Sequence, residues 1–191
     1  EFLQKSSKEN LFILCKNFKY RFTTDEQIAT FLFAIKEIIA KFGSLENCFL
    51  SFYLPKKDYL FALQNFAKTL RSYGNISTLI PDPTKNSALK RLNLFMRWCV
   101  RKDNVDLGCW SKISCDNLLI PLDVHIFRVS KSLGLTKRNQ ADIKTALEIS
   151  KNLAQINPKD PIKYDKRTYL QYYWSLLKTK HPYIFLLLFF I

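Results

Sequence analysis

Positive side chains are concentrated, without any acidic residue, in one stretch of the sequence at residues 84–102. The cations of this stretch are Lys85, Lys90, Arg91, Arg97, Arg101 and Lys102. Helical spacing would place Lys90, Arg97 and Arg101 on one face and a run of apolar residues on another. Cations grouped in this way can bind phosphate, although a solvated face of ordinary lysines and arginines fits the same pattern. We therefore predict a helix that is buried on one side and offers cations on another.

The second residue with chemical potential is an aspartate that precedes a helical pattern. Asp123 stands two residues after Pro121, where its carboxylate can accept a hydrogen bond from the amide of His125 or Ile126 and cap the helix. Spacing alone favours this capping role. His125 is interpreted as a packed or hydrogen-bonded structural residue. Arg128 could reach a phosphate or the aspartate at the helix start, and a structural salt bridge fits it equally well.

The elements around these residues are predicted to be helical. Thr24 opens a capping-box pattern, and the apolar spacing that follows it continues to Gly43, a natural helix stop. The other predicted helices span residues 44–54, 58–74, about 87–102, 123–134 and about 139–154, with a last one after Pro161. Strand-like alternation is scarce and no internal repeat is visible, so we predict an all-α fold in a single domain.

The composition is strongly basic but belongs to a folded chain. Among 191 residues, 30 lysines and arginines against 16 acidic residues give a net charge of +14. A hydrophobic content of 48% excludes a disordered basic tail as the source of this charge. Only four glycines argue against glycine-rich phosphate loops and dinucleotide-binding motifs. The composition therefore favours a polyanion as partner, with nucleic acid first.

The cysteines and the chain ends carry further expectations. Five cysteines without a C-x-x-C pair, together with two histidines, favour reduced thiols over a disulfide framework or a metal site. The apolar run at residues 183–191 is shorter than the ~20 residues that span a bilayer. Because the sequence opens on Glu1 and not on methionine, a preceding segment is expected.

Residues 122–129 resemble the V-D-x-H-x-x-R-V segment of the helix-hairpin-helix base-excision DNA glycosylases. This superfamily includes endonuclease III and the 8-oxoguanine glycosylases. The resemblance implies the helical DNA glycosylase fold, with Asp123 as the catalytic carboxylate. It also implies Lys90, in the preceding helix, as the nucleophile of a bifunctional member. The separation between the two residues is longer than in most members and comparable to that of the archaeal 8-oxoguanine glycosylases.

A closer resemblance covers roughly residues 20–165. It is to a bacterial family of unknown function that is placed near these glycosylases. Three blocks carry it: KRLNLFMRW at 90–98, PLDVH at 121–125 and DPIKYD at 160–165. The blocks occur in order and imply membership, but they do not identify a reaction.

The glycosylase resemblance implies an enzyme that removes a damaged base flipped out of a DNA duplex, with or without an abasic-site lyase step. Cleavage of the N-glycosidic bond builds positive charge on the sugar, which Asp123 would stabilise. Neighbouring arginines would favour the neutral amine of Lys90, which could attack C1′ and form a Schiff base. The cations assigned to nucleic-acid binding are Lys85, Arg91, Arg97, Arg101 and Arg128. Trp98 and Trp110 are candidate stacking platforms, although core positions are the simpler expectation.

Two features depart from the glycosylase pattern. The stretch at 79–85 lacks the glycines of the family's L-P-G-V-G hairpin, so we predict that amides near residues 86–89 bind a phosphate instead. Beyond the third block, the tail at 166–191 diverges, and we interpret it as a frameshift or truncation that replaced the last packing helix. The cysteine spacing of the iron–sulfur members is also absent.

Two other classes of function stay open at this point. A non-catalytic helical module would bind nucleic acid through the face at 85–102. A degenerate gene product would be poorly soluble and melt without cooperativity. The leading prediction is a monomeric, cytoplasmic, all-α repair enzyme with its helical domain at 1–165, which acts on lesion-containing duplex DNA without metal, cofactor or membrane.

Overall fold

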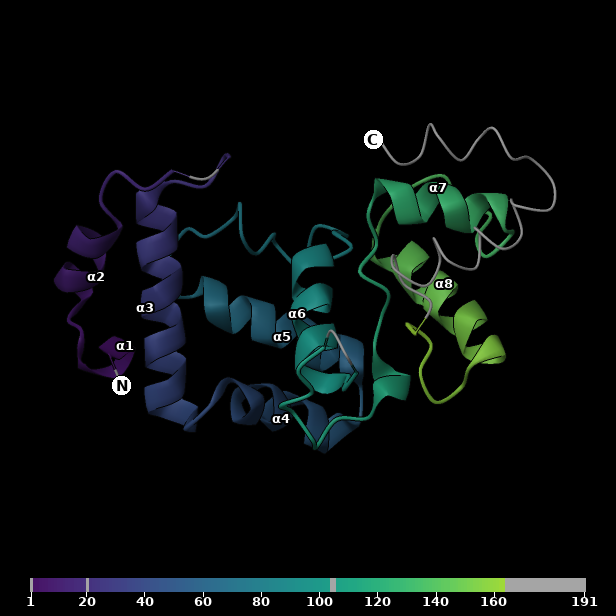
Figure 1. The fold of residues 1–191 in the computed structure, drawn as a ribbon, viewed down its shortest axis with the longest axis horizontal. Helices are drawn as coiled ribbons and strands as arrows, with labels where there is room; N and C mark the ends of the chain where they lie inside the picture. The colour runs from purple at the N-terminus through teal and green to yellow at the C-terminus, as the bar shows by residue number, and fades with distance from the viewer. Residues whose placement is uncertain (1, 20, 104–105, 164–191) are drawn as a thin grey trace.

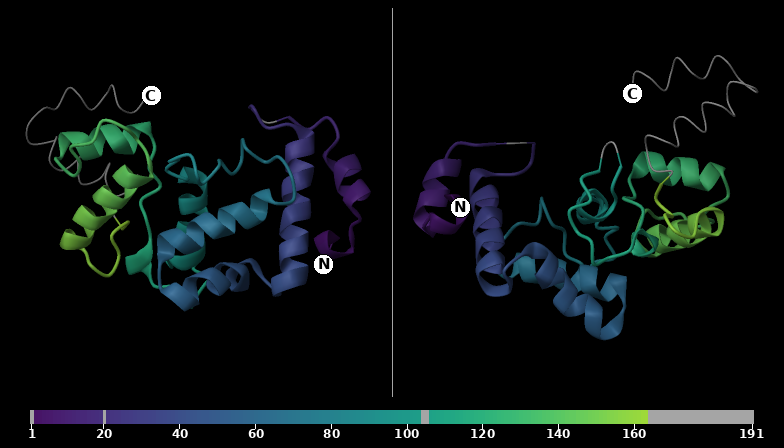
Figure 2. Two further views of the ribbon diagram at one scale, coloured as in Figure 1. Left: turned by 180° about the vertical axis from the view of Figure 1, so that it is seen from behind. Right: turned by 60° about the horizontal axis from the view of Figure 1, so that its bottom comes forward.

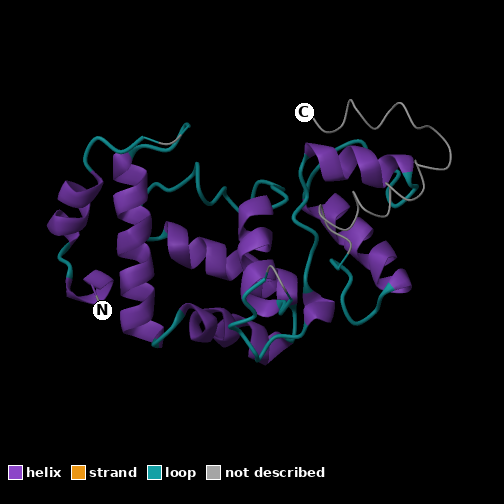
Figure 3. Cartoon of the chain, in the orientation of Figure 1, coloured by secondary structure: helices purple, strands orange, loops and turns teal. Residues whose placement is uncertain are grey.

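The computed structural model describes residues 2–19, 21–103 and 106–163. Over these ranges the chain forms α-helices and loops, without a β-strand (Figures 1 and 3). The α-helices are α1 (Phe2–Lys5), α2 (Lys8–Cys15), α3 (Asp25–Phe42), α4 (Leu45–Lys56), α5 (Tyr59–Arg71), α6 (Lys90–Val100), α7 (Val124–Ser132) and α8 (Ile143–Ile156). A short 3₁₀ helix, Cys115–Asn117, lies between α6 and α7. The predicted all-α class is confirmed for this part of the chain.

Helix α3, with 18 residues, organises the N-terminal half of the molecule. Helices α1 and α2 contact one side of it, and α4 and α5 contact another. Helices α7 and α8 lie at the opposite end of the molecule from α1 and α2 (Figures 1 and 2). Helix α6 therefore stands between the N-terminal helices and the C-terminal pair.

Polar N-caps start several helices where the sequence predicted them. The Gln27 amide donates to Thr24 Oγ1 and the Thr24 amide donates to Gln27 Oε1, both at 3.3 Å, which completes the predicted capping box of α3. This helix ends at Gly43, whose φ of +79° is the left-handed conformation expected of a helix stop. At the starts of α5 and α7, the carboxylates of Asp58 and Asp123 accept hydrogen bonds from the amides of Phe61 and Ile126 and act as N-caps. Local side-chain chemistry is sufficient to set these boundaries.

Helix α6 begins later than predicted, at Lys90 and not at residue 87. The residue before it, Leu89, has φ +48° and ψ +38°, a left-handed conformation that prevents the right-handed helix from starting earlier. Such a conformation costs a leucine about 1–2 kcal/mol. The side chain of Leu89 is almost completely buried, and this burial offsets the strain. As a result, Lys90 is the first helical residue of α6.

Two further boundaries differ from the prediction. Helix α8 starts at Ile143, after residue 139, because the Asp142 carboxylate accepts from the Thr145 amide at 2.8 Å and acts as the N-cap. Helix α4 continues through Pro55, which lies in its last turn, so the hydrogen bond that the proline cannot donate is lost at the end of the helix and not in its middle.

An aromatic cluster forms the centre of the core. The ring centroid of Phe49 lies 6.0 Å from those of both Phe66 and Trp110, and Phe95 of α6 packs edge-on against Trp110 at 5.5 Å. The expectation of a core position is therefore confirmed for Trp110. It is wrong for Trp98, whose surface is 46% exposed.

None of the helices in the described ranges combines the length and the apolar character that a membrane crossing requires. The helix predicted after Pro161 and the divergent tail at 166–191 fall outside the described residues. The predicted boundary of the helical domain at residue 165 falls outside them as well.

Candidate functional site

Lys90 and Asp123 meet where two helices begin. The Nζ atom of Lys90, the first residue of α6, lies 3.3 Å from Oδ2 of Asp123, the N-cap of α7. The lysine side chain is 48% exposed and the aspartate side chain 10%, so the carboxylate lies beneath the amine. The structure thus brings together the two residues predicted to be catalytic. An ordinary ion pair has the same geometry, so the contact by itself assigns no reaction.

The two carboxylate oxygens of Asp123 have separate contacts. Oδ1 accepts a hydrogen bond from the Ile126 amide at 2.8 Å, which is the predicted helix cap. Oδ2 is the oxygen nearest to Lys90. The segment that leads to Asp123 is attached to α8, because the Ile120 amide donates to Ser150 Oγ of that helix at 2.9 Å. One residue therefore caps α7 and holds a carboxylate oxygen at the lysine.

The loop before α6 fixes the position of Lys90. The buried Asn93 side chain donates from Nδ2 to the Ala88 carbonyl at 3.0 Å, and the Ile143 amide of α8 donates to the Asn86 carbonyl at 3.1 Å. The Leu89 amide donates to Ser87 Oγ at 3.3 Å. This amide was one of those predicted to bind a phosphate, and that prediction is wrong for it because the donor is already used.

Carboxylates pair with two of the three cations on the predicted cationic face of α6. Arg97 and Arg101, assigned to nucleic-acid binding, are instead buried, with side chains 11% and 8% exposed. Arg97 Nε lies 3.0 Å and Arg101 Nη1 lies 2.5 Å from the same oxygen, Oδ2 of the fully buried Asp106. Arg101 also donates to Asp103 at 2.9 Å and to Asp160 at 3.0 Å. The assignment of these two arginines to a phosphate-binding surface is wrong, because both are buried and paired with carboxylates of the fold.

Arg101 is held in its charged form by this network. Burial opposes the charge of the guanidinium, but the hydrogen bonds and charge of Asp160, followed by the charges of Asp103 and Asp106, raise the pKa of Arg101 above its usual value. The charge of Arg101 is therefore balanced by carboxylates within the fold.

The remaining predicted nucleic-acid contacts lie at the surface. Lys85, Arg91 and Arg128 are exposed. Arg91 donates from its guanidinium to the Thr78 carbonyl, so part of its hydrogen-bonding capacity is used within the chain. Of the predicted nucleic-acid-binding residues, these three are the ones that a phosphate could reach, and the predicted nucleophile Lys90 is half exposed as well.

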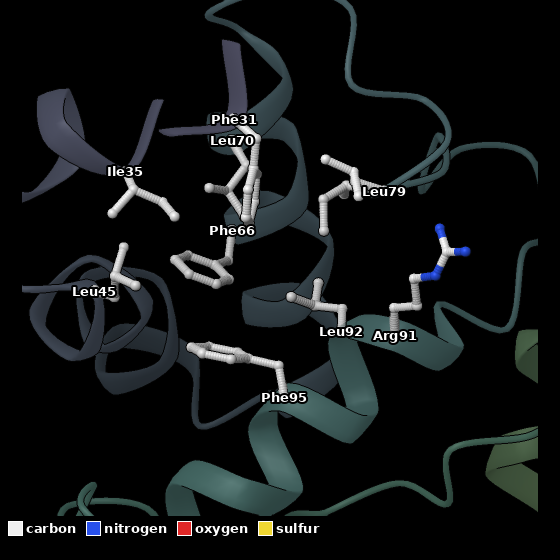
Figure 4. Close-up of a pocket in the computed structure, with 10 residues that line it drawn as sticks. Phe31, Ile35, Leu45, Phe66, Leu70, Leu79, Arg91, Leu92 and Phe95 are labelled. Carbon is white, nitrogen blue, oxygen red and sulfur yellow. The ribbon is translucent and has the colours of Figure 1, made fainter. Parts of the chain in front are cut away.

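An apolar cavity of about 270 Å³ lies beside α6 (Figure 4). It is lined by side chains of α3, α4, α5, α6 and the loop at 79–80, with Arg91 at its edge. Neither Lys90 nor Asp123 lines it. On the α6 helix, Leu92 and Phe95 face this cavity while Lys90 faces α7, so the cavity and the Lys90–Asp123 pair are separate features.

Metal ligands do not gather anywhere in the described ranges. Groups of three or more histidine, cysteine, aspartate or glutamate side chains with metal-binding geometry are absent from them.

Comparison with known families identifies the chain. A family model described as "Protein of unknown function (DUF2400)" matches residues 1–169, which is more than half of the sequence. The chain belongs to this family. No curated protein and no solved structure matches it. The predicted membership in a family of unknown function is therefore confirmed, and the description of DUF2400 names no reaction and no glycosylase.

Three acidic residues of this DUF2400 chain were missed as members of a buried network. Asp103 and Asp106 follow directly after the acid-free stretch, and this switch in charge was the available signal. Asp160 opens the third sequence block, but its partner Arg101 is 59 positions away in the sequence. Only the tertiary fold reveals that contact.

Proposed function

We propose that this protein is a DNA glycosylase with an associated lyase step, in which Lys90 is the amine nucleophile and Asp123 is the carboxylate. The observation that carries the proposal is the distance of 3.3 Å between Lys90 Nζ and Asp123 Oδ2 across two helix starts. The glycosylase-like sequence around Asp123 and the net charge of +14 support it.

The chemistry needs an amine that solvent and substrate can reach, beside a carboxylate that stays in place. Lys90 is half exposed, whereas Asp123 is held by the Ile126 amide and by its place beneath the lysine. In the reaction, the neutral Lys90 amine forms a bond to C1′ of the sugar while the N-glycosidic bond breaks. The base leaves with the electron pair of that bond and takes up a proton.

Asp123 has two roles in this proposal. Its carboxylate accepts the proton that Lys90 must lose before it attacks, since the two groups are within proton-transfer reach. Once that proton has been passed to solvent, the carboxylate is negative again and stabilises the positive charge that develops on the sugar. Opening of the sugar ring then leaves a Schiff base between Nζ and C1′, from which the lyase step eliminates the 3′ phosphate.

Base release and strand cleavage on a panel of lesion duplexes test the proposal. The panel contains abasic, uracil, 8-oxoguanine and alkylated-base sites in otherwise identical duplexes. We expect activity on at least one lesion, with a loss of 100-fold or more in Lys90→Ala and in Asp123→Asn. Lys131→Ala, which changes another surface lysine on a neighbouring helix, is the matched control and should leave the rate unchanged. Absence of base release from every duplex would refute the proposal.

The second candidate is a non-catalytic nucleic-acid-binding module, for which the exposed cations Lys85, Arg91 and Arg128 provide the observation. It predicts DNA binding that weakens with salt and survives Asp123→Asn, without base release. Lys85→Ala should lower the slope of log K against log salt by about 1 if this lysine contacts a phosphate. Arg97→Ala would instead destabilise the fold, because this arginine is buried against Asp106.

A further inference from the structure

Cys99, near the end of α6, and Cys109, in the loop that follows it, lie close together. The chain between them contains the buried Asp106. After α6 the chain folds back on itself, with an isolated bridge between Lys102 and Leu107. The Gly108 amide then donates to the Trp98 carbonyl at 3.0 Å, and the Trp110 amide donates to the Cys99 carbonyl at 2.7 Å. Cys109 is thereby held between two residues that are both hydrogen-bonded to the end of α6, and its side chain lies near that of Cys99.

The two thiols differ in their access to solvent. Cys99 is buried, at 8% exposed, whereas Cys109 is exposed. Burial, followed by the proximity of Cys109, raises the pKa of Cys99 to about 12, so this thiol stays protonated. A dissolved oxidant therefore reaches Cys109 first, and Cys99 is the buried thiol next to it.

The other cysteines are placed differently. Cys15 and Cys48 are buried, and Cys115, which is partly buried, has its sulfur 4.0 Å from the Val100 carbonyl oxygen. Metal binding by the Cys99–Cys109 pair lacks support, because no third ligand joins them within the described residues. All five cysteines are free thiols in this structure.

We propose that Cys99 and Cys109 form a reversible disulfide when the protein meets a hydroperoxide. The Cys109 thiolate attacks the O–O bond of hydrogen peroxide, which gives a sulfenic acid on Cys109 and one water after proton transfer. The sulfur of Cys99 then displaces the hydroxyl group, forms the S–S bond and gives up its proton, which releases a second water. Two thiols are oxidised, one peroxide is reduced, and a dithiol such as dithiothreitol reverses the change.

The disulfide would tie the segment at 107–110 to the end of α6, the helix that begins with Lys90. It closes a short loop that contains Asp103 and Asp106, the partners of Arg101. Constraint of this loop in the unfolded chain should raise the melting temperature of the oxidised protein by several degrees. This proposal does not depend on the proposed enzymatic activity.

The test uses the full chain, reduced and then treated with a small excess of hydrogen peroxide. We expect the intact mass to fall by two hydrogens, peptide mapping to join Cys99 to Cys109, and dithiothreitol to restore both the mass and the melting temperature. Cys99→Ala should instead accumulate a Cys109 sulfenic acid that a cyclic 1,3-dione traps, and Cys48→Ala should leave the disulfide intact. A disulfide at another pair, a mixed disulfide between two chains, or oxidation of Cys109 to sulfinic acid in the unaltered protein would overturn the proposal.

Discussion

Arg101 Nε donates to both carboxylate oxygens of Asp160, at 3.2 Å and 3.0 Å, and joins the end of α6 to the turn that follows α8. The start of the same helix contacts α7 through Lys90 and Asp123. The three sequence blocks that predicted the family thus meet at α6, one at each of its ends and one along its length. We infer that this helix holds the C-terminal helices in place, because both of its charged ends are paired with them.

Loss of the Asp106 carboxylate should destabilise the protein strongly. Asp106→Asn leaves two buried guanidinium groups without their shared charge, which we expect to lower the free energy of unfolding by about 3–5 kcal/mol. Asp103→Asn is the matched control, since the Asp103 side chain is 37% exposed and its removal should cost about 1 kcal/mol or less. Urea unfolding followed by circular dichroism measures both. Equal losses for the two variants would contradict the burial argument.

The capping and ion-pairing roles of Asp123 can be separated by two substitutions. Asp123→Ala removes the acceptor of the Ile126 amide and should cost about 1 kcal/mol, whereas Asp123→Asn keeps the cap and should cost about 0.5 kcal/mol or less. The ion pair adds little because Lys90 is half exposed. Chemical denaturation of the two variants checks this order. If Asn proves as costly as Ala, the carboxylate charge is the larger structural contribution.

A glycine is required where the chain folds back after α6. Gly108 has φ +60°, and a Cβ atom there would lie 2.5 Å from Lys102 Cβ and 2.9 Å from its Cα. Gly108→Ala should therefore cost about 3 kcal/mol, from backbone strain together with a clash against main chain. Gly134→Ala shares the positive φ, but among the described residues no atom outside the neighbouring ones would lie within 4 Å of the added Cβ, so only the conformational cost of about 1 kcal/mol is expected. Thermal unfolding of both variants tests the difference, which a similar loss at the two glycines would contradict.

The start of α8 should contribute stability that is lost in acid. Partial burial disfavours the Asp142 carboxylate, but the Thr145 amide and Arg138 outweigh it and lower the pKa of Asp142 below its usual value. A carboxylate with a lowered folded pKa stabilises the fold above the unfolded value near ~3.9 and loses this contribution as pH falls through the folded value. The stability difference between the unaltered protein and Asp142→Asn should therefore be largest at neutral pH and shrink below about pH 4. Denaturant unfolding across pH would show the opposite trend, or none, if the carboxylate were not stabilised by folding.

Helix boundaries were predictable where a local side chain sets them. Thr24, Asp58 and Asp123 each accept from an amide three residues ahead, and such short-range chemistry can be read from sequence. The start of α6 was not predictable, because Leu89 takes a left-handed conformation that is stabilised by burial of its side chain. A tertiary contact has overridden the local preference there.

The candidate site was predicted in part. The pairing of Lys90 with Asp123 came from the family resemblance, since spacing alone favoured a simple cap. The cationic face was predicted to be exposed, and this was wrong for Arg97 and Arg101. Their carboxylate partners lie in segments whose position against α6 the sequence pattern did not indicate. Periodicity places charges on a face, but it does not reveal which acidic residues cover that face.

The central claim is that Lys90 attacks the sugar with Asp123 beside it, and reductive trapping tests this claim most directly. Borohydride reduces a Schiff base to a stable amine, so the reaction on the lesion duplexes can be stopped and the modified peptide located by mass spectrometry. We predict one adduct, on Lys90, which disappears in Lys90→Ala, falls at least 100-fold in Asp123→Asn and persists in Lys131→Ala. An adduct on another lysine, or no adduct on a duplex whose strand the protein cleaves, would contradict the assignment.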